Sequence, residues 1–419
     1  MSHPEGPATP GTGTATPEPP PAPAAKPTAA SGRWFDTIVV TLLAFVAAMA
    51  IGAILIAVSD QATRDSASYF FSYPWDTFTS AGSAIGNAYT ALFEGAIYNP
   101  HIAANHTLAG YLGPLSETLV NATPLILGGL SVGLAFRAGL FNIGGQGQII
   151  LGAIFAGFVG FHWHLPVVVH VLVAIAAGIL GGALWGGLAG WLKARTGAHE
   201  VITTIMLNYV AFYLLAYLLS VKGFQAPPYG QAISNPVDGN AKLFPLLGST
   251  LRVLAGLFLA LLAAAFIWWL LKYSTLGFRL RAVGANPFAA RTAGMSVERS
   301  YTTVMLVSGG LAGLAGVSQI LGTNAQVTQD IDAGIGFDAI TVALLGRANA
   351  VGIVFAGLLF GALHAGGTQM QTFTPIDLVQ VIQSLIVLFI AAPAVIRAIF
   401  RLRVSTDGVG GELAKGWNG

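Results

Sequence analysis

The stretch RAGLFNIGGQGQIILGAIFAG, Arg137 to Gly157, interrupts a long apolar sequence with glycines and three carboxamide side chains. Its flanks are typical of membrane helices, and its middle is not. Inside a bilayer, backbone that is not helical is tolerated only where protein buries it or where it lines a wet cavity. Transporters use interrupted helices to bring backbone groups and polar side chains to a solute. The stretch therefore predicts a membrane protein with a broken helix at a functional position.

The composition of the whole chain agrees with a membrane environment. Its 419 residues are 54% hydrophobic and only 9% charged, whereas soluble domains carry about 25% charged residues. The 53 glycines fit membrane helices, because small residues let neighbouring helices pack closely there. The chain has no cysteine, which excludes a disulfide framework, a thiolate nucleophile and a cysteine-ligated metal.

Apolar windows predict an all-α polytopic membrane protein with about ten membrane segments, some of them short or broken. A spanning helix needs about 20 mostly apolar residues. We expect a disordered Pro/Ala-rich tail at 1–33, a membrane domain at 34–400 with a cytoplasmic loop at 272–300, and a second tail at 401–419. The apolar windows lie near 35–58, 116–136, 143–161, 166–191, 201–221, 251–271, 301–321, 337–346, 350–365 and 376–399.

The distribution of charge predicts which ends of the segments face the cytoplasm. The window 272–299 holds five basic residues against Glu298 alone, and more basic residues follow the last segment. By the positive-inside rule, both regions are cytoplasmic. The window 59–116 holds four acidic residues and only Arg64 as a basic one, so we expect an external loop there. An even number of segments then places both termini in the cytoplasm.

One segment carries a glycine at every fourth position: Gly178, Gly182, Gly186 and Gly190. Residues spaced in this way share one face of a helix, and small residues on that face let two helix backbones approach closely. We expect the face to contact another helix of the same chain. A dimer interface is the alternative.

The basic window contains the signals of a short helix. Asn286 is a good N-cap residue, and Pro287 suits the first helical position. Arg291 would lie in the last turn, where the helix dipole favours a cation, and Gly294 suits the residue that ends a helix. A helix of about two turns is marginal on its own, and it would present Phe288 to one side. We expect it to dock a cytoplasmic partner, with a solvated loop as the alternative.

Four blocks carry a resemblance to a known family. They are GLFNIGGQGQ (139–148), HEVITTIMLNYV (199–210), LGFRLRAVGANPFAARTAGM (276–295) and GFDAITVALLGRANAVGIVFAGLLFG (336–361). With the blocks in this order, the chain resembles the permease subunits of ATP-binding cassette importers in the branched-chain amino acid and simple-sugar permease family. It is most similar to the branch associated with nucleoside uptake. It departs from the pattern at Gln146, where many relatives are acidic, and in its proline-rich tail.

The resemblance implies a transport subunit that is not an enzyme and has no catalytic residue. The phosphate-binding loop of an ATPase ends in Gly-Lys-Ser/Thr, and the chain contains no Gly-Lys pair. ATP hydrolysis is therefore expected on separate ATP-binding cassette ATPase subunits. The short capped helix matches the family's coupling helix, which docks on the ATPase. The residues expected to serve this coupling are Arg279, Arg281, Asn286, Pro287, Phe288 and Arg291.

The resemblance also implies further partners and a location. The nucleoside branch typically pairs two unlike permeases, so a second related permease subunit is expected. The chain has no external domain large enough to capture a ligand, so a substrate-binding lipoprotein or periplasmic protein is expected as well. The chain should cross the lipid bilayer of the bacterial cytoplasmic membrane several times. No cofactor, no metal and no nucleic acid is expected to bind it.

The carboxamides of the broken stretch supply hydrogen-bond donors and acceptors without a charge. That chemistry suits a neutral, hydroxyl-rich or base-bearing solute. We expect Asn142, Gln146, Gln148 and the intramembrane Asn208 to line the substrate path. The alternative is that these side chains tie helices together or satisfy the interrupted backbone. A nucleoside is the expected solute, with a simple sugar next and a branched-chain amino acid third.

Two other polar features each allow two interpretations. Glu200 either contacts the ATPase or caps the helix that it begins, and capping is favoured. Asp377, Gln380 and Ser384 share one helical face, which should meet a cavity or a partner helix. The rival class is an ion-coupled secondary transporter. It commonly uses intramembrane acids, whereas the acids of this chain lie mostly in loops or near segment ends.

Overall fold

The computed structural model describes residues 30–245, 251–252 and 255–401, and within these ranges the regular elements are helices. The predicted tail at 401–419 falls outside the described residues except for its first residue, and the tail at 1–33 except for its last four. Short pieces of 3₁₀ helix (Gly239–Ala241) and π-helix (Ser318–Asn324) accompany the α-helices. The α-helices are α1 (Ala30–Ser59), α2 (Gln61–Ala67), α3 (Pro74–Ala96), α4 (Pro100–Ala103), α5 (Leu108–Arg137), α6 (Gly145–His162), α7 (Val167–Thr196), α8 (Glu200–Leu218), α9 (Ala255–Tyr273), α10 (Thr275–Ala285), α11 (Pro287–Thr292), α12 (Val297–Val317), α13 (Ile335–Leu345), α14 (Ala350–Met370), α15 (Ile376–Ala391) and α16 (Pro393–Ile399).

The predicted membrane segments correspond to helices of the structure. Seven helices are long and apolar enough to cross a membrane, namely α1, α5, α7, α8, α9, α12 with its π-helical extension, and α14. The helix α6 has 18 residues, and α13 and α15 supply shorter apolar helices. The last predicted window divides at Ala392 into α15 and α16. The prediction of an all-α polytopic membrane protein is confirmed.

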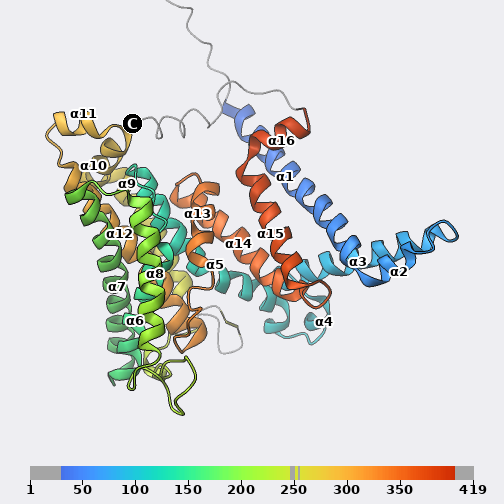
Figure 1. Cartoon of the computed structure of the whole chain (residues 1–419), viewed down its shortest axis with the longest axis horizontal. Coiled ribbons are helices and arrows are strands. Elements are labelled where there is room, and N and C mark those ends of the chain that lie inside the picture. Colours follow the sequence, from blue (N-terminus) through green and yellow to red (C-terminus); the bar gives the residue numbers. More distant parts are fainter. Residues whose placement is uncertain (1–29, 246–250, 253–254, 402–419) are drawn as a thin grey trace, which may run out of the picture.

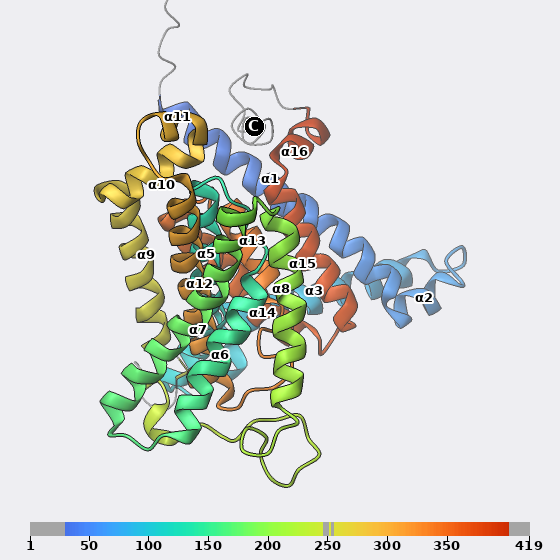
Figure 2. The same ribbon diagram turned by 60° about the vertical axis from the view of Figure 1, so that its left-hand side comes forward.

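Two helices form the centre of the bundle, α5 and α12. In each of them, 78% of the most apolar window is buried inside the protein, against 22% in α8. The helix α12 packs along α7, α6 and α5, and α5 also packs against α14, α13 and α9. Figures 1 and 2 show α5 and α12 behind or between the other helices from both directions. The broken stretch at 138–144 therefore leads out of one of the two most buried helices.

The glycine face of α7 lies against α12. A Cβ atom at Gly182 would lie 2.6 Å from the Cα of Gly313, and one at Gly186 would lie 2.9 Å from the Cα of Gly309. Such distances leave no room for a side chain, so the two backbones are in direct contact. The predicted contact within the chain is confirmed, and this face is not free for a dimer interface.

The window 59–116, predicted to be an external loop, is largely helical, and the loop prediction was wrong there. The helix α3 has 23 residues and packs against α14 and α1. A Cβ at Gly95 would lie 2.6 Å from the Cβ of Gln369 in α14. The helix escaped the apolar-window search because serine, threonine and asparagine side chains alternate with its apolar face, which lowers the average hydropathy of any window.

Several basic elements lie at the same end of the molecule. In both views, α10, α11, α16 and the first turns of α1 lie at one end, whereas the connection that follows α8 lies at the other (Figures 1 and 2). Arg291 is in the last turn of α11 and Arg397 in that of α16. The positive-inside rule predicts that this end faces the cytoplasm, and the cytoplasmic position of both termini likewise stays a prediction.

Candidate functional site

The break between α5 and α6 begins at a glycine-dependent helix end. Gly139 has a φ of +73°, in the left-handed region that glycine enters without steric cost. The N–H of Leu140 donates to the carbonyl of Ala135 over 3.0 Å, and that of Gly139 to the carbonyl of Phe136 over 3.1 Å. This two-bond pattern is the Schellman motif. The chain therefore leaves α5 in a defined direction and enters the protein interior.

The interior segment is held by Asn142, whose side chain is fully buried. Its amide nitrogen donates to the Oε1 of Gln148 over 3.0 Å and to the Oγ of Ser308 over 2.9 Å. Its oxygen accepts from the Nε2 of Gln148 over 3.1 Å and from the backbone N–H of Gly144 over 3.0 Å. A carboxamide offers two donor hydrogens and two acceptor lone pairs. The hydrogen-bonding capacity of Asn142 is thus filled by the protein itself.

Asn208 of α8 performs the capping of α6 from another part of the chain. The first turn of a helix has N–H groups without intrahelical partners, and Gly144 at the N-cap has no side chain to serve them. The Oδ1 of Asn208 accepts from the N–H of Gly147 over 2.9 Å. Its Nδ2 donates to the carbonyl of Ile143, also over 2.9 Å. The side chain of Asn208, at 4% exposure, therefore satisfies one backbone group inside the break and one in the first turn of α6.

Gln146 is in a different position from the other three carboxamides. It is only partly buried, and its side chain hydrogen-bonds the carboxylate of Asp332. Asp332 lies just before α13 and is 5% exposed. Burial raises the pKa of its carboxyl group, and the hydrogen bond from Gln146 opposes that rise. One of its carboxylate oxygens, Oδ2, is buried without a hydrogen-bond partner among the described residues.

The site therefore contains a buried acid that the sequence analysis missed. The sequence did contain a signal. Asp332 lies shortly before the predicted window 337–346, and that apolar window is too short to cross a membrane. The structure brings this segment to the break: a Cβ at Gly145 would lie 3.2 Å from the carbonyl oxygen of Gly336. The N-terminal ends of α6 and α13 thus meet inside the bundle, with Gln146 and Asp332 at the junction.

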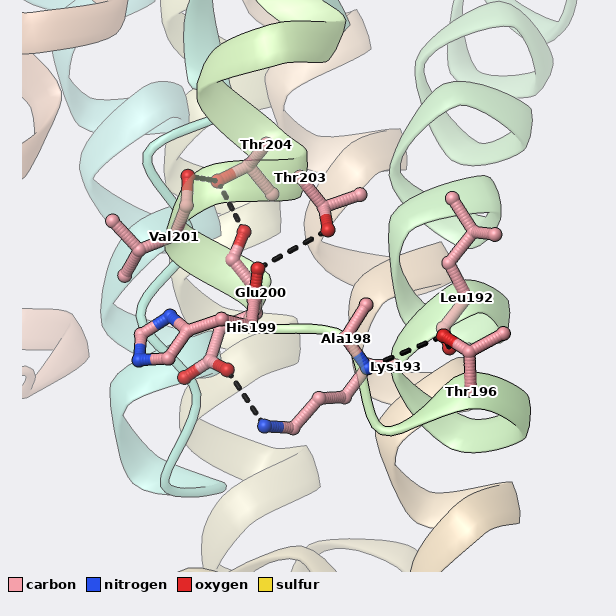
Figure 3. A network of polar contacts seen from close by, with 9 residues as sticks. All are labelled: Leu192, Lys193, Thr196, Ala198, His199, Glu200, Val201, Thr203 and Thr204. Atoms are coloured by element: carbon pink, nitrogen blue, oxygen red, sulfur yellow. Dashed lines mark hydrogen bonds and ion pairs between the residues drawn. The ribbon is translucent and has the colours of Figure 1, made fainter.

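A second polar network joins α7 to α8 (Figure 3). The Nζ of Lys193 lies 2.8 Å from the Oε2 of Glu200, and both side chains are mostly buried. The hydroxyls of Thr203 and Thr204 donate to the carbonyls of His199 and Glu200. The side chain of Glu200 pairs with Lys193 and does not cap α8, whose N-cap residue is His199 without a side-chain capping bond. The favoured capping role of Glu200 was therefore wrong, because the preceding helix supplies a cation within reach.

The predicted short helix exists as α11, with the predicted ends. The Oδ1 of Asn286 accepts from the N–H of Phe288 over 3.0 Å and from that of Ala289 over 3.1 Å. Gly294 has a φ of +80° and closes the helix with the same two-bond pattern that ends α5. Arg291 forms an ion pair with Glu298 of α12. The helix is thus fixed to the bundle, and the side chain of Phe288 is 75% exposed.

The other residues of the predicted coupling set flank this helix. Arg279 and Arg281 are exposed on α10, which precedes α11. Pro287 is the first residue of α11. The structure therefore brings the six predicted residues to one end of the molecule, on two consecutive helices (Figure 2).

The polar face predicted on the last segment is present on α15. Asp377, Gln380 and Ser384 are exposed and border one open groove of about 500 Å³ along that helix. The groove lies on the surface of the single chain.

Comparisons with known proteins agree with this architecture. The family model described as "Branched-chain amino acid transport system / permease component" matches residues 115–391. The guanosine ABC transporter permease protein NupP of Bacillus subtilis is 36% identical, over 76% of this chain and 89% of NupP. The glucose ABC transporter permease protein TsgB13 of Haloferax volcanii is also 36% identical, over 68% of this chain and 77% of TsgB13.

A third relative, the nucleoside ABC transporter permease protein NupB of Lactococcus lactis, is 33% identical over 72% of this chain and 86% of NupB. Each of these three organisms also contributes a second, less similar permease. No solved structure matches the chain. The chain belongs to the branched-chain amino acid transport system permease family, and it is a multi-pass permease subunit of an ATP-binding cassette importer in the cytoplasmic membrane.

Proposed function

We propose that this permease carries nucleosides and that the junction of α6 and α13 forms part of the path. The observation that carries the proposal is the meeting of two helix N-terminal ends inside the bundle, where Gly145 and Gly336 are in backbone contact. Transporters bind solutes at such interrupted helices. The solutes named for NupP and NupB, guanosine and nucleosides, support the choice of solute.

A simple sugar is the second candidate solute, because TsgB13 is named for glucose and has the same identity as NupP, over a smaller share of the chain. Both solutes are neutral and rich in hydroxyl groups. Uncharged hydrogen-bonding side chains such as Gln146 suit either of them. A branched-chain amino acid, with its two charged groups, fits this uncharged chemistry less well.

The four carboxamides have two different roles in this proposal. Gln146 is only partly buried and contacts the solute as it passes. Asn142, Gln148 and Asn208 are buried and bonded to one another or to backbone, so they hold the break in shape. The path therefore depends on Gln146 for contact and on the other three for geometry.

The proposed function is tested by transport with the complete complex. The permease would be reconstituted in liposomes with its partner subunits and its binding protein, and uptake of radiolabelled guanosine, uridine and glucose would be measured. ATP-dependent accumulation of the nucleosides, and not of glucose, is the expected result. Accumulation of glucose alone would contradict the proposal and would identify the transported solute as a sugar.

The partners of the permease are proposed on the same basis. ATP-binding cassette ATPases would dock on α10 and α11, where Phe288 extends from the bundle at 75% exposure. An extracytoplasmic substrate-binding lipoprotein or periplasmic protein would deliver the solute to the opposite end. The proline-rich tail at 1–33 has no assigned role in this arrangement.

Reversing the chemistry of the docking helix should uncouple transport from ATP hydrolysis. In a Phe288→Asp, Arg291→Glu double variant, the apolar contact is lost and the ion pair with Glu298 becomes a repulsion. We expect uptake to fall by about tenfold or more, which corresponds to a rise of about 1.4 kcal/mol in the barrier to transport. The amount of membrane-inserted protein should stay unchanged, because both side chains are exposed. Normal uptake by this variant would mean that the loop at 272–300 only orients the chain in the membrane and does not couple it to the ATPase.

The membrane part of the importer should be a heterodimer of two unlike permeases. The supporting observation is that three organisms each contribute two permease relatives of this chain, one more similar than the other. Purification of the tagged chain from its native membrane should co-isolate a second, related permease together with ATPases. Recovery of this permease alone with ATPases would favour a homodimer.

A further inference from the structure

Outside the break, an acid of α13 and a histidine of α14 form a pair. The Nε2 of His364 lies 3.1 Å from the Oδ2 of Asp338, and the two side chains are 33% and 36% exposed. Asp338 is in the first turn of α13, and His364 precedes the end of α14 by six residues. At 1.5 Å per residue, His364 is about 9 Å from that end of the helix.

This pair lies at membrane depth. The 11 residues of α13 span about 16 Å, roughly half of the hydrocarbon thickness. The end of α13 lies near the end of α5, where Arg137 donates to the carbonyl of Ala348 over 2.9 Å. Its beginning lies against Gln146 at the break. Asp338 is therefore one turn from the break, and an ionisable group at this depth is expected to face a wet cavity or a partner.

The outer face of α13 carries Phe337, Asp338 and Thr341, followed two turns after Phe337 by the exposed Leu344. The opposite face of the helix packs on α5, where a Cβ at Gly128 would lie 2.8 Å from the Cβ of Ala339. Phe337 is 52% exposed, and Thr341 is partly exposed one turn further on. An aromatic ring, a carboxylate and a hydroxyl thus share an uncovered surface that begins at the solute junction proposed above.

These groups match the chemistry of a nucleoside better than that of a sugar alone. Aromatic side chains stack on nucleobases because every base has a π-face, and the strength of stacking differs between bases. A carboxylate accepts hydrogen bonds from base N–H groups or from ribose hydroxyls, and an imidazole has a second ring nitrogen that can donate or accept. The pair with His364 fixes the orientation of the carboxylate.

We infer that the outer face of α13, with His364 of α14, is a solute subsite in which a nucleobase stacks on Phe337 while Asp338 hydrogen-bonds the base edge or the ribose. This inference rests on the proposed function and adds a second contact region beyond Gln146. The subsite is a transient contact along the path, so it acts on the rate and on the choice among nucleosides. High-affinity capture stays with the external binding protein.

The alternative is that the pair only ties α13 to α14. A structural tie affects all solutes alike, because it changes the amount or the stability of the complex. A solute contact changes the rates of different nucleosides by different factors. The ratio of uptake rates for two nucleosides therefore separates the two roles.

The experiment measures initial uptake of guanosine and of uridine by the reconstituted complex, each with saturating loaded binding protein. The variants are Phe337→Leu, Asp338→Asn and His364→Gln. The control is Phe355→Leu, an aromatic residue of α14 that is 68% exposed. Phe355 precedes His364 by nine residues and so lies on the opposite side of the helix, about 180° away.

We expect Phe337→Leu and Asp338→Asn to change the guanosine-to-uridine ratio by about threefold or more, because guanine and uracil differ in stacking strength and in the hydrogen-bonding groups of their edges. The Phe355→Leu control should keep the wild-type ratio. An unchanged ratio in Phe337→Leu overturns the subsite, and because Phe337 is exposed, that variant stays informative even if Asp338→Asn does not accumulate. Wild-type complex that carries no nucleoside overturns the proposed function instead.

Discussion

Replacement of Gly182 by valine should abolish the accumulation of folded permease. A Cβ at this position would lie 2.6 Å from the Cα of Gly313, and a valine adds two methyl groups to that Cβ. Overpacking a core costs about 1–3 kcal/mol where flexible side chains can yield, and here the obstacle is backbone. Since 1.4 kcal/mol is a factor of ten, we expect at least a tenfold loss, measured as monodisperse protein after extraction in detergent.

The matched control is Gly86→Val in α3. A Cβ at Gly86 would meet no atom within 4 Å, so the same chemical change should leave the yield near that of the wild type. Wild-type yield and heat stability of Gly182→Val would mean that α7 and α12 cross at a greater distance than the structure gives. That outcome would contradict the glycine contact as the basis of the central packing.

Replacement of Asn142 by leucine should remove most of the folded protein without changing transport by the remainder. The change removes both side-chain partners that Asn142 provides to Gln148 and the acceptor of the N–H of Gly144. Ser308 loses one bond and keeps those to Ser131. Each buried polar group left without a partner costs about 1–3 kcal/mol, so the combined loss is comparable to the whole stability of many domains, about 5–15 kcal/mol. Yield and uptake per folded complex would be measured in the same preparation.

Gln146→Leu is the matched comparison for Asn142→Leu, because it also replaces a carboxamide of the break by leucine. Gln146 is partly buried and hydrogen-bonds one buried group, the carboxylate of Asp332, so its replacement should cost less stability than that of Asn142, while uptake per folded complex should slow by roughly tenfold through the lost hydrogen bonds. If Asn142→Leu instead folds well and slows uptake, its carboxamide contacts the solute directly. The division of the carboxamides into contact and support would then be wrong.

The short helix α11 could be predicted in detail from the sequence. Asn286 caps it and Gly294 closes it, and the N-cap bonds reach only two and three residues along the chain. Signals of this range are complete within the local sequence. The apolar windows were informative for the same reason, because the hydropathy of a segment is a property of its own residues. The amphipathic α3 was the exception, since its apolar face is completed by α14.

The function of the individual carboxamides could not be predicted in this way. Asn142 and Ser308 are 166 residues apart in the chain, and Asn208 and Gly147 are 61 residues apart. A carboxamide that lines a path and one that caps a distant helix have the same composition and the same place in a motif. Only the burial of the side chain and the identity of its partners distinguish them.

A helical membrane protein with a break after α5 and a short capped helix could be predicted from local sequence, because hydrophobicity, glycine positions and caps act within a few residues, and the permease family came from the resemblance of four sequence blocks. That Asn208 caps α6, that Gln146 meets Asp332 and that Asp338 pairs with His364 became visible only in the folded chain. These contacts depend on how α6, α8, α13 and α14 cross. The crossings are set by the glycine surfaces of several helices at once, and no single stretch of the chain contains that information.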